Sequence, residues 1–123
     1  AAGHALPEIV LARAGAAAGG PVQARVAPQP GAAHDWAGYW AGYWAVTEDG
    51  HESRVRAGEN AGETLRHDHV VRLLQPLAPF AAREGLSSRL DVPPGVPAHP
   101  RRVVFVLTTV AQALPVQAVA LDC

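Results

Sequence analysis

Hydrophobic and polar residues alternate along several short stretches, and this alternation predicts β-strands. In PVQARVAP, Val22, Ala24 and Val26 alternate with Gln23 and Arg25, which is the period of two typical of a half-buried strand. The stretch RRVVFVLTTV is rich in β-branched residues, which favour strands over helices. Further strand-like stretches are Ile9–Arg13, LSSRLDV at 86–92 and PVQAVALDC at 115–123.

The tetrad WAGY occurs twice in WAGYWAGYWAV and predicts an aromatic strand. In an extended chain Trp36, Trp40 and Trp44 point to one side, while Tyr39 and Tyr43 point to the other. The spacing of four also fits a helix, but the two glycines disfavour one. At least one aromatic face is expected to join the core. An aromatic face left over would be an interaction surface for a sugar, a peptide or a domain, and the candidate residues are Trp36, Tyr39, Trp40 and Tyr43.

Glycine and proline mark the connections between the strand-like stretches. Asp49-Gly50 in TEDGHES is a strong hairpin signal, so ESRVRA is predicted to return alongside the aromatic strand. In AGENAG, Gly58 and Gly62 flank Asn60, which predicts a second turn or a bulge.

LRHDHVVRLL is predicted to form one strand that ends at Pro76. His67 and His69 then share one face of that strand. A helix with Asn60 as N-cap and Glu63 as its capping-box partner is the alternative. The strand fits better, because Gly62 and the pair Val70-Val71 are poor helix formers.

Short strands joined by Gly- and Pro-rich loops, without a long helical pattern, predict an all-β fold. The chain has 123 residues, the usual size of one domain. We therefore expect a single antiparallel β-sandwich-like domain over 1–123. Residues 1–35 would be a less regular N-terminal segment and residues 36–123 the core.

Composition excludes some classes of function. The formal net charge is −1 and all ten basic residues are arginine, so the chain lacks the basic surface expected of a nucleic-acid-binding protein. The most apolar run, VVFVLTTVAQALPVQAVAL, is interrupted by Thr, Gln and Pro, so we expect no membrane span.

The motif around AGENAG resembles a known family. With RRVVFVLTTVAQALPVQAVALDC farther along, it is similar to the C-terminal, β-rich portion of secreted, thioredoxin-like bacterial and plant proteins of unknown function. The resemblance is good from Trp44 to Cys123 and implies a periplasmic or secreted location, although the sequence shows no signal peptide. The thioredoxin-like part is absent here, so no redox activity is carried over. The residues that match the family's G-E-N-x-G-x-T-L-x-H pattern and its continuation are Gly58, Glu59, Asn60, Gly62, Thr64, Leu65, His67, Val70, Val71 and Arg72.

A metal site is the most specific chemical hypothesis. Two histidines at i and i+2 on a strand, His67 and His69, suit Cu²⁺ or Zn²⁺. His51, His34 or Glu59 would supply a third ligand. The structural alternative is a pair of hydrogen-bonded histidines at a strand end, for which no cofactor is required.

A catalytic role is less well supported than a structural one. Glu59, His67 and Asp68 would offer an acid/base set, but no serine lies in a nucleophile-elbow context and the lone cysteine is terminal. In the structural interpretation Glu59 pairs with an arginine, Arg66 or Arg72. The chain on its own is therefore not expected to be an enzyme.

Cys123 cannot form a disulfide within the chain, because it is the only cysteine. It is expected to be either a free thiol or, as is common for an odd cysteine in an exported protein, part of an intermolecular disulfide with a partner segment. On the resemblance, the expected function is a non-catalytic accessory or interaction domain that binds a thioredoxin-like domain or another protein chain. The alternative is a periplasmic metal-binding module that uses His67 and His69.

Overall fold

The computed structural model describes residues 7–13, 20–28, 38–54, 57–58 and 61–122. The elements in this part of the chain are all β-strands, and all pair antiparallel, which confirms the predicted all-β fold. The strands are β1 (Ile9–Arg13), β2 (Gly20–Val26), β3 (Tyr39–Glu48), β4 (His51–Arg54), β5 (Thr64–His67), β6 (Val70–Ala81), β7 (Leu86–Val92), β8 (Arg101–Thr108) and β9 (Pro115–Asp122).

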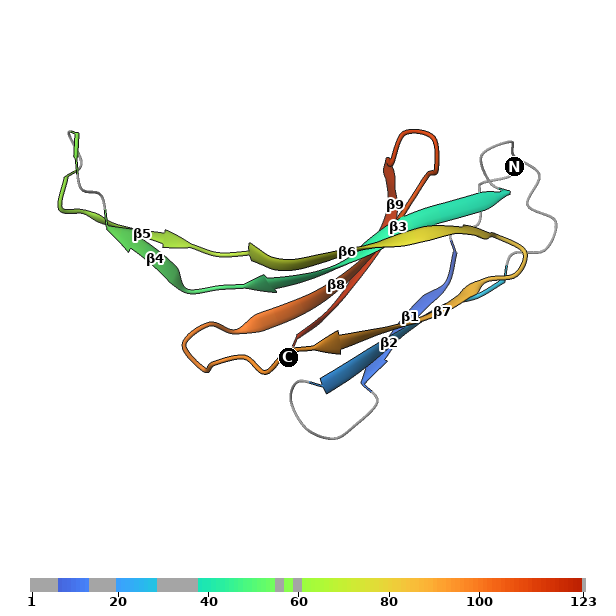
Figure 1. Cartoon of the computed structure of the whole chain (residues 1–123), viewed down its shortest axis with the longest axis horizontal. Coiled ribbons are helices and arrows are strands. Elements are labelled where there is room, and N and C mark those ends of the chain that lie inside the picture. The colour runs from blue at the N-terminus through green and yellow to red at the C-terminus, as the bar shows by residue number, and fades with distance from the viewer. Residues whose placement is uncertain (1–6, 14–19, 29–37, 55–56, 59–60, 123) are drawn as a thin grey trace.

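Two sheets enclose one hydrophobic core (Figure 1). One sheet has the order β1-β2-β7, and the other has the order β6-β3-β8-β9. The alternation predicted for β2 is confirmed, because Val22, Ala24 and Val26 are all buried. Trp44 packs edge-on against Phe105 at a ring distance of 4.9 Å, and its Nε1 donates to Ser88 Oγ on the facing sheet at 2.9 Å. The aromatic strand therefore supplies the centre of the core.

The hairpin predicted at Asp49-Gly50 is wrong. β3 pairs with β6 and β8, and β4 pairs with β5, so the chain continues past Gly50 instead of reversing there. Gly50 has φ of +77°, which kinks the strand without folding it back. The reversal lies farther along, between β4 and β5.

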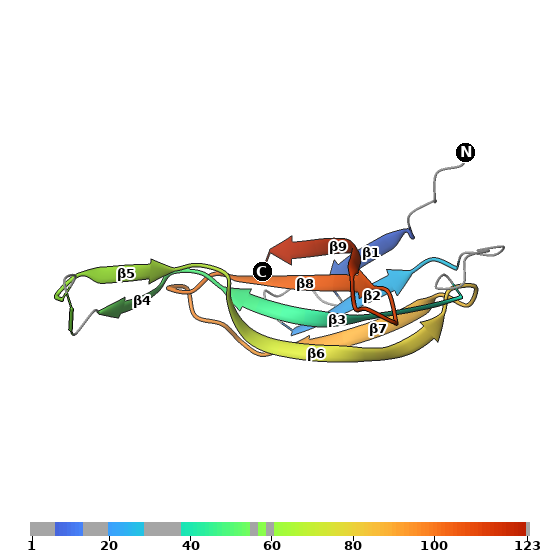
Figure 2. The same cartoon turned by 90° about the horizontal axis from the view of Figure 1, so that it is seen from above.

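The strands β4 and β5 form a ribbon that leaves the sandwich, and we call residues 51–67 the arm. Figures 1 and 2 show the arm extending away from the two sheets in both views. It continues the β3–β6 pair beyond a break in both strands, at Asp49-Gly50 on one and Asp68-His69 on the other. The single strand predicted over LRHDHVVRLL is therefore divided into β5 and β6.

The strand end predicted at Pro76 is also wrong. β6 runs through Pro76 and Pro79 to Ala81. It lies at the edge of its sheet, with β3 on one side only. Proline removes a backbone donor, and an edge strand tolerates this loss where the missing N–H would face away from the sheet.

Candidate functional site at the base of the arm and on the outer sheet face

Two aspartates join the broken strands at the base of the arm. Asp68 Oδ1 accepts the backbone N–H of Gly50 at 2.9 Å, and Asp49 Oδ1 accepts the backbone N–H of His69 at 2.8 Å. Each aspartate thus satisfies an amide on the opposite strand, where the regular ladder is interrupted. Both breaks use a left-handed residue, Gly50 and His69, the latter with φ of 56°.

The loop between β7 and β8 packs against this joint. Asp49 N donates to the carbonyl of Pro100 at 3.0 Å, and His99 Nδ1 lies 3.2 Å from the carbonyl of Asp49. The rings of His51 and His99 stack with centroids 3.9 Å apart and planes inclined by 5°. A Cβ on Gly50 would lie only 2.8 Å from the carbonyl oxygen of Ala98. The loop therefore fits closely against the start of the arm.

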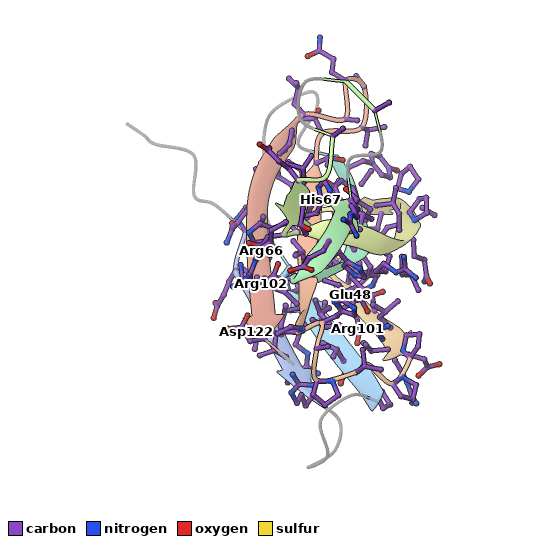
Figure 3. All side chains as sticks on the ribbon, turned by 90° about the vertical axis from the view of Figure 1, so that its left-hand side faces the viewer. Glu48, Arg66, His67, Arg101, Arg102 and Asp122 are labelled. Carbon is purple, nitrogen blue, oxygen red and sulfur yellow. The ribbon has the colours of Figure 1, made fainter. Side chains whose placement is uncertain are left out.

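A buried carboxylate, Glu48, lies at the last position of β3. It is 4% exposed and contacts two arginines and a histidine from three other segments. Its Oε2 accepts from Arg101 Nε at 2.5 Å, its Oε1 lies 2.8 Å from His51 Nε2, and Arg72 Nε approaches to 3.5 Å. Figure 3 shows Glu48 and Arg101 next to each other when the molecule is seen from the arm end. Arg101 also donates to the carbonyl of Pro93, which ties the β7–β8 loop to the same cluster.

The pKa values of two carboxylates at the base of the arm, Glu48 and Asp68, are lowered. The hydrogen bond from Arg101, followed by that from His51, holds the pKa of Glu48 below its ordinary value, against an opposing effect of burial. The pKa of Asp68 is lowered chiefly by the Gly50 amide and then by Arg66. Both groups are therefore stabilised as carboxylates at neutral pH.

The two histidines predicted to share a strand face are separated by the break. His67 ends β5, with Nε2 2.8 Å from the hydroxyl of Ser53, whereas His69 lies in the kink with Nδ1 3.7 Å from Asp49 Oδ1. The alternation that would align His67 with His69 stops at Asp68. The strand register places His51, not His69, directly opposite His67.

Within the ranges that the structure describes, no group of three or more His, Cys, Asp or Glu side chains is arranged to hold a metal ion. The proposed third ligands His34 and Glu59, and the thiol of Cys123, lie outside those ranges. In the same described ranges, no helix is long and apolar enough to span a membrane.

The described residues of the AGENAG motif and its continuation lie in the arm and at the start of β6. Glu59 and Asn60 lie outside the described residues, and Gly58 and Gly62 have φ of +93° and +90°. The amide of Ala61 donates to the Gly58 carbonyl, as in a turn. Thr64 begins β5. The arginines proposed as partners of Glu59 have other contacts, because Arg66 pairs with Asp68 and Arg72 approaches Glu48.

The aromatic residues proposed for an interaction surface do not share one environment. Trp40 is buried in the core at 4% exposure, so it cannot belong to such a surface. Trp36 lies outside the described residues. Tyr39 is exposed and Tyr43 half-buried, and both point to the other side of β3, away from Trp40 and Trp44.

That other side of the four-stranded sheet is apolar. The register aligns two rows across all four strands, and a third row at the sheet end carries the exposed ion pair Arg102–Asp122. We call the residues of the two apolar rows the outer face. They are Leu74, Ala45, Val104 and Ala120 in one row, and Pro76, Tyr43, Val106 and Ala118 in the other.

Exposure on the outer face is greatest in the edge strands β6 and β9, whereas Ala45 and Val106 in the middle are each only 6% exposed. Leu74 is 60% exposed, and Val71 beside it in the third row is 58% exposed. The corresponding side of the three-stranded sheet is mainly polar, because β2 and β7 present Gln23, Arg25, Ser87, Arg89 and Asp91 there, while β1 adds Val10 and Ala12. The four-stranded sheet therefore carries the more apolar outer side.

Sequence reasoning missed most of the residues at the joint. Glu48, His99 and Arg101 were not predicted as site residues, because each has an ordinary local context and they meet only in the folded chain. Asp49 was identified only as part of a predicted hairpin turn. One signal was available for Glu48: it is an acidic residue at the end of an otherwise apolar strand, where a cationic partner is required.

Comparison with known proteins gives one match. A family model described as a protein of unknown function (DUF1223) matches residues 10–108, well over half of the chain. No curated protein and no solved structure matches significantly. By this match, the chain belongs to the DUF1223 family of proteins of unknown function.

Proposed function

We propose that this chain is a non-catalytic interaction domain that binds a protein partner through the outer face. The observation that carries the proposal is the pair of apolar rows across β6, β3, β8 and β9, with no charged side chain in either row. A sheet side exposed to water normally alternates with polar residues, as it does on the other sheet here.

The composition of the outer face suits a protein partner. It combines a tyrosine, branched aliphatic residues and small alanines, and the Arg102–Asp122 pair lies at its end rather than in its centre. Protein interfaces have a similar arrangement, in which aromatic and aliphatic residues form the centre and charges form the rim. The two rows contain no charged side chain of the kind that would select an acidic or a basic ligand.

The partner that we propose is a thioredoxin-like domain of an exported protein. The support is the resemblance of the AGENAG motif region to secreted proteins that carry such a domain. A periplasmic or secreted location forms part of the same proposal. The apolar outer face adds a physical reason, since a domain that packs permanently on a neighbour needs a surface of this kind.

The experiment is a binding titration with a thioredoxin-like domain from one of the secreted proteins that the AGENAG motif region resembles. The isotope-labelled chain is titrated and its amide shifts are followed by NMR. We expect shifts confined to β6, β3, β8 and β9, and at least a tenfold loss of affinity for Leu74→Arg, because a buried arginine without a partner is costly. Val10→Arg, an exposed apolar position on the other sheet, is the matched control.

The outer face would be excluded as the docking surface if the partner bound without changing the amide shifts of β6, β3, β8 and β9. It would also be excluded if Leu74→Arg and Val10→Arg weakened binding equally. Absence of binding to thioredoxin-like domains from several members would remove the proposed partner.

Metal binding is a second proposal, supported by one observation. His51 and His67 are directly opposite in the β4–β5 register, and such residues have Cβ atoms about 5 Å apart. Two imidazoles at that spacing can turn toward one Cu²⁺ or Zn²⁺, with nitrogen–metal distances of about 2.0–2.1 Å. Glu48, 2.8 Å from His51 Nε2, is the nearest carboxylate.

A titration with Cu²⁺ or Zn²⁺ separates the two histidine pairings. If the metal binds to His51 and His67, which the register places opposite each other, His51→Ala and His67→Ala each weaken binding and His69→Ala does not. If the metal binds to His67 and His69, which are two residues apart in the sequence, His67→Ala and His69→Ala are the sensitive variants. Identical stoichiometry and affinity in all of them would end the metal proposal.

A further inference from the structure

The arm has an edge that the fold leaves unused. β4 pairs with β5 on one side, and no other described strand pairs with it. The described arm residues are exposed, apart from half-buried His51 at the base. A two-stranded ribbon is only marginally stable by itself in water, and a free strand edge readily accepts another strand. A ribbon held by the Asp49–Asp68 joint therefore presents a pre-arranged edge.

The exposed charges of β4 have no partners among the described residues. The ion pairs of the described part of the chain use neither Glu52 nor Arg54. The two side chains flank Ser53 and point to the same side of the strand. Opposite charges one position either side of a central residue make the strand self-complementary when it is paired with its own copy in antiparallel orientation.

We infer that the free edge of β4 binds β4 of a second copy of this chain. With Ser53 on the two-fold axis, Glu52 lies opposite the partner's Arg54, and Arg54 lies opposite the partner's Glu52. The two arms then form one four-stranded sheet in the order β5-β4-β4-β5. Within each chain, the β4–β5 register also places Arg66 of β5 opposite Glu52. Each glutamate thus lies between two arginines.

The chain itself gives the reason to favour a second copy over a different protein. An unrelated strand would need an arginine and a glutamate at the same spacing, whereas a second copy always carries both. The proline-containing half of β6 is a poor edge for pairing, since Pro76 and Pro79 lack N–H donors. This inference does not depend on the outer face or on its proposed partner.

The test is sedimentation velocity of the 123-residue chain over a range of concentrations. We expect a reversible monomer–dimer equilibrium that weakens with added salt, because exposed ion pairs are screened. Glu52→Arg and Arg54→Glu each place like charges opposite each other and are expected to weaken dimerisation about tenfold or more. The exchanged variant Glu52→Arg/Arg54→Glu restores opposite charges and is expected to dimerise like the natural chain.

A mixture of the two single variants provides the decisive comparison. One variant then presents two positive charges at these positions and the other two negative charges, so they are expected to associate with each other more strongly than either does with itself. This outcome cannot arise from misfolding of either chain. A natural chain that stays monomeric at millimolar concentration would overturn the inference. Equal dimerisation of all variants, or a mixture no stronger than its components, would overturn it as well.

Discussion

Asp49 and Asp68 each accept the backbone N–H next to the other, at 2.8 Å and 2.9 Å, and so lock two broken strands together. The arrangement replaces two ladder hydrogen bonds at the point where the ribbon changes direction. Because the bonds are reciprocal, the two breaks are coupled, and neither strand can straighten without releasing an amide on the other. This joint gives the arm its direction relative to the sandwich.

Removal of either aspartate should loosen the arm without unfolding the sandwich. Asp49→Ala or Asp68→Ala leaves the N–H of His69 or of Gly50 without its carboxylate acceptor, and the arm strands are held by few other contacts. We expect severalfold faster hydrogen exchange of the β4 and β5 amides, with core amides of β3 and β8 unchanged. The measurement is native-state hydrogen exchange by NMR.

The control for this prediction is Asp91→Ala, which removes an exposed carboxylate that pairs with Arg89 in β7. It should leave the arm amides as they are. Unaltered exchange in both joint variants would show that the β7–β8 loop alone sets the direction of the arm.

Gly50→Ala should be more damaging than Gly58→Ala, although both glycines have positive φ. Each substitution forces alanine into the left-handed region, at about 1 kcal/mol or somewhat more. At Gly50 the new Cβ also meets the carbonyl oxygen of Ala98 at 2.8 Å, whereas at Gly58 nothing lies within 4 Å. We expect Gly50→Ala to lower the free energy of unfolding by about 2 kcal/mol in urea denaturation, and Gly58→Ala to lower it less. Equal losses would mean that the β7–β8 loop yields easily.

The two WAGY repeats should respond differently to the same substitution. A Cβ on Gly42 would lie 2.1 Å from the carbonyl oxygen of Val106, where β8 runs close beside β3, while Gly38 has open space around it. Gly42→Ala therefore has to separate two paired strands and should cost about 3 kcal/mol or prevent folding. Gly38→Ala, at the equivalent position of the repeat, should be nearly neutral. Similar stability of the two variants by thermal melting would contradict this assignment.

The repeat also shows how far the sequence could predict the fold. Alternation found β2 and β9, because a strand with one buried face must place its apolar residues at every second position, and the run of β-branched residues found β8. The same rule separated the Trp40–Trp44 side of β3 from the Tyr39–Tyr43 side and predicted that at least one of the two lies in the core. It could not show that the opposite side is apolar as well, since alanine and tyrosine occur on both exposed and buried faces.

The errors have a common physical origin. Asp49-Gly50 supplies a residue that accepts positive φ, and a kink needs this as much as a hairpin does. A hairpin forms if β4 pairs with β3, and a kink forms if β4 pairs with β5. Which pairing occurs depends on strands that are distant in the sequence. Pro76 ends a strand in the middle of a sheet but not at its edge, and the edge position of β6 is likewise a property of the whole sheet.

The side-chain cluster at the joint could not be predicted from the sequence for a further reason. Glu48, His51, Arg72, His99 and Arg101 come from separate segments, and no spacing in the sequence connects them. Their meeting depends on the packing of the β7–β8 loop against the kink.

Glu48 should make the stability of the chain depend on pH in the acidic range. Its pKa in the folded chain is held below the ordinary value of 4.5 by Arg101 and His51. The unfolded chain therefore takes up the proton more readily, so this contribution to stability is complete above about pH 4.5 and is lost as the pH falls toward the folded value. Glu48→Gln should cost about 2 kcal/mol at pH 7, because Arg101 loses its carboxylate partner, and should flatten the decline in stability below pH 4.5. Denaturant unfolding at pH 7, 5, 4 and 3 measures both effects. Glu84→Gln, which removes an exposed carboxylate that takes part in none of the described ion pairs, should follow the natural chain throughout. If Glu48→Gln and the natural chain lost stability in parallel as the pH fell, Glu48 would not be the group whose protonation lowers the stability.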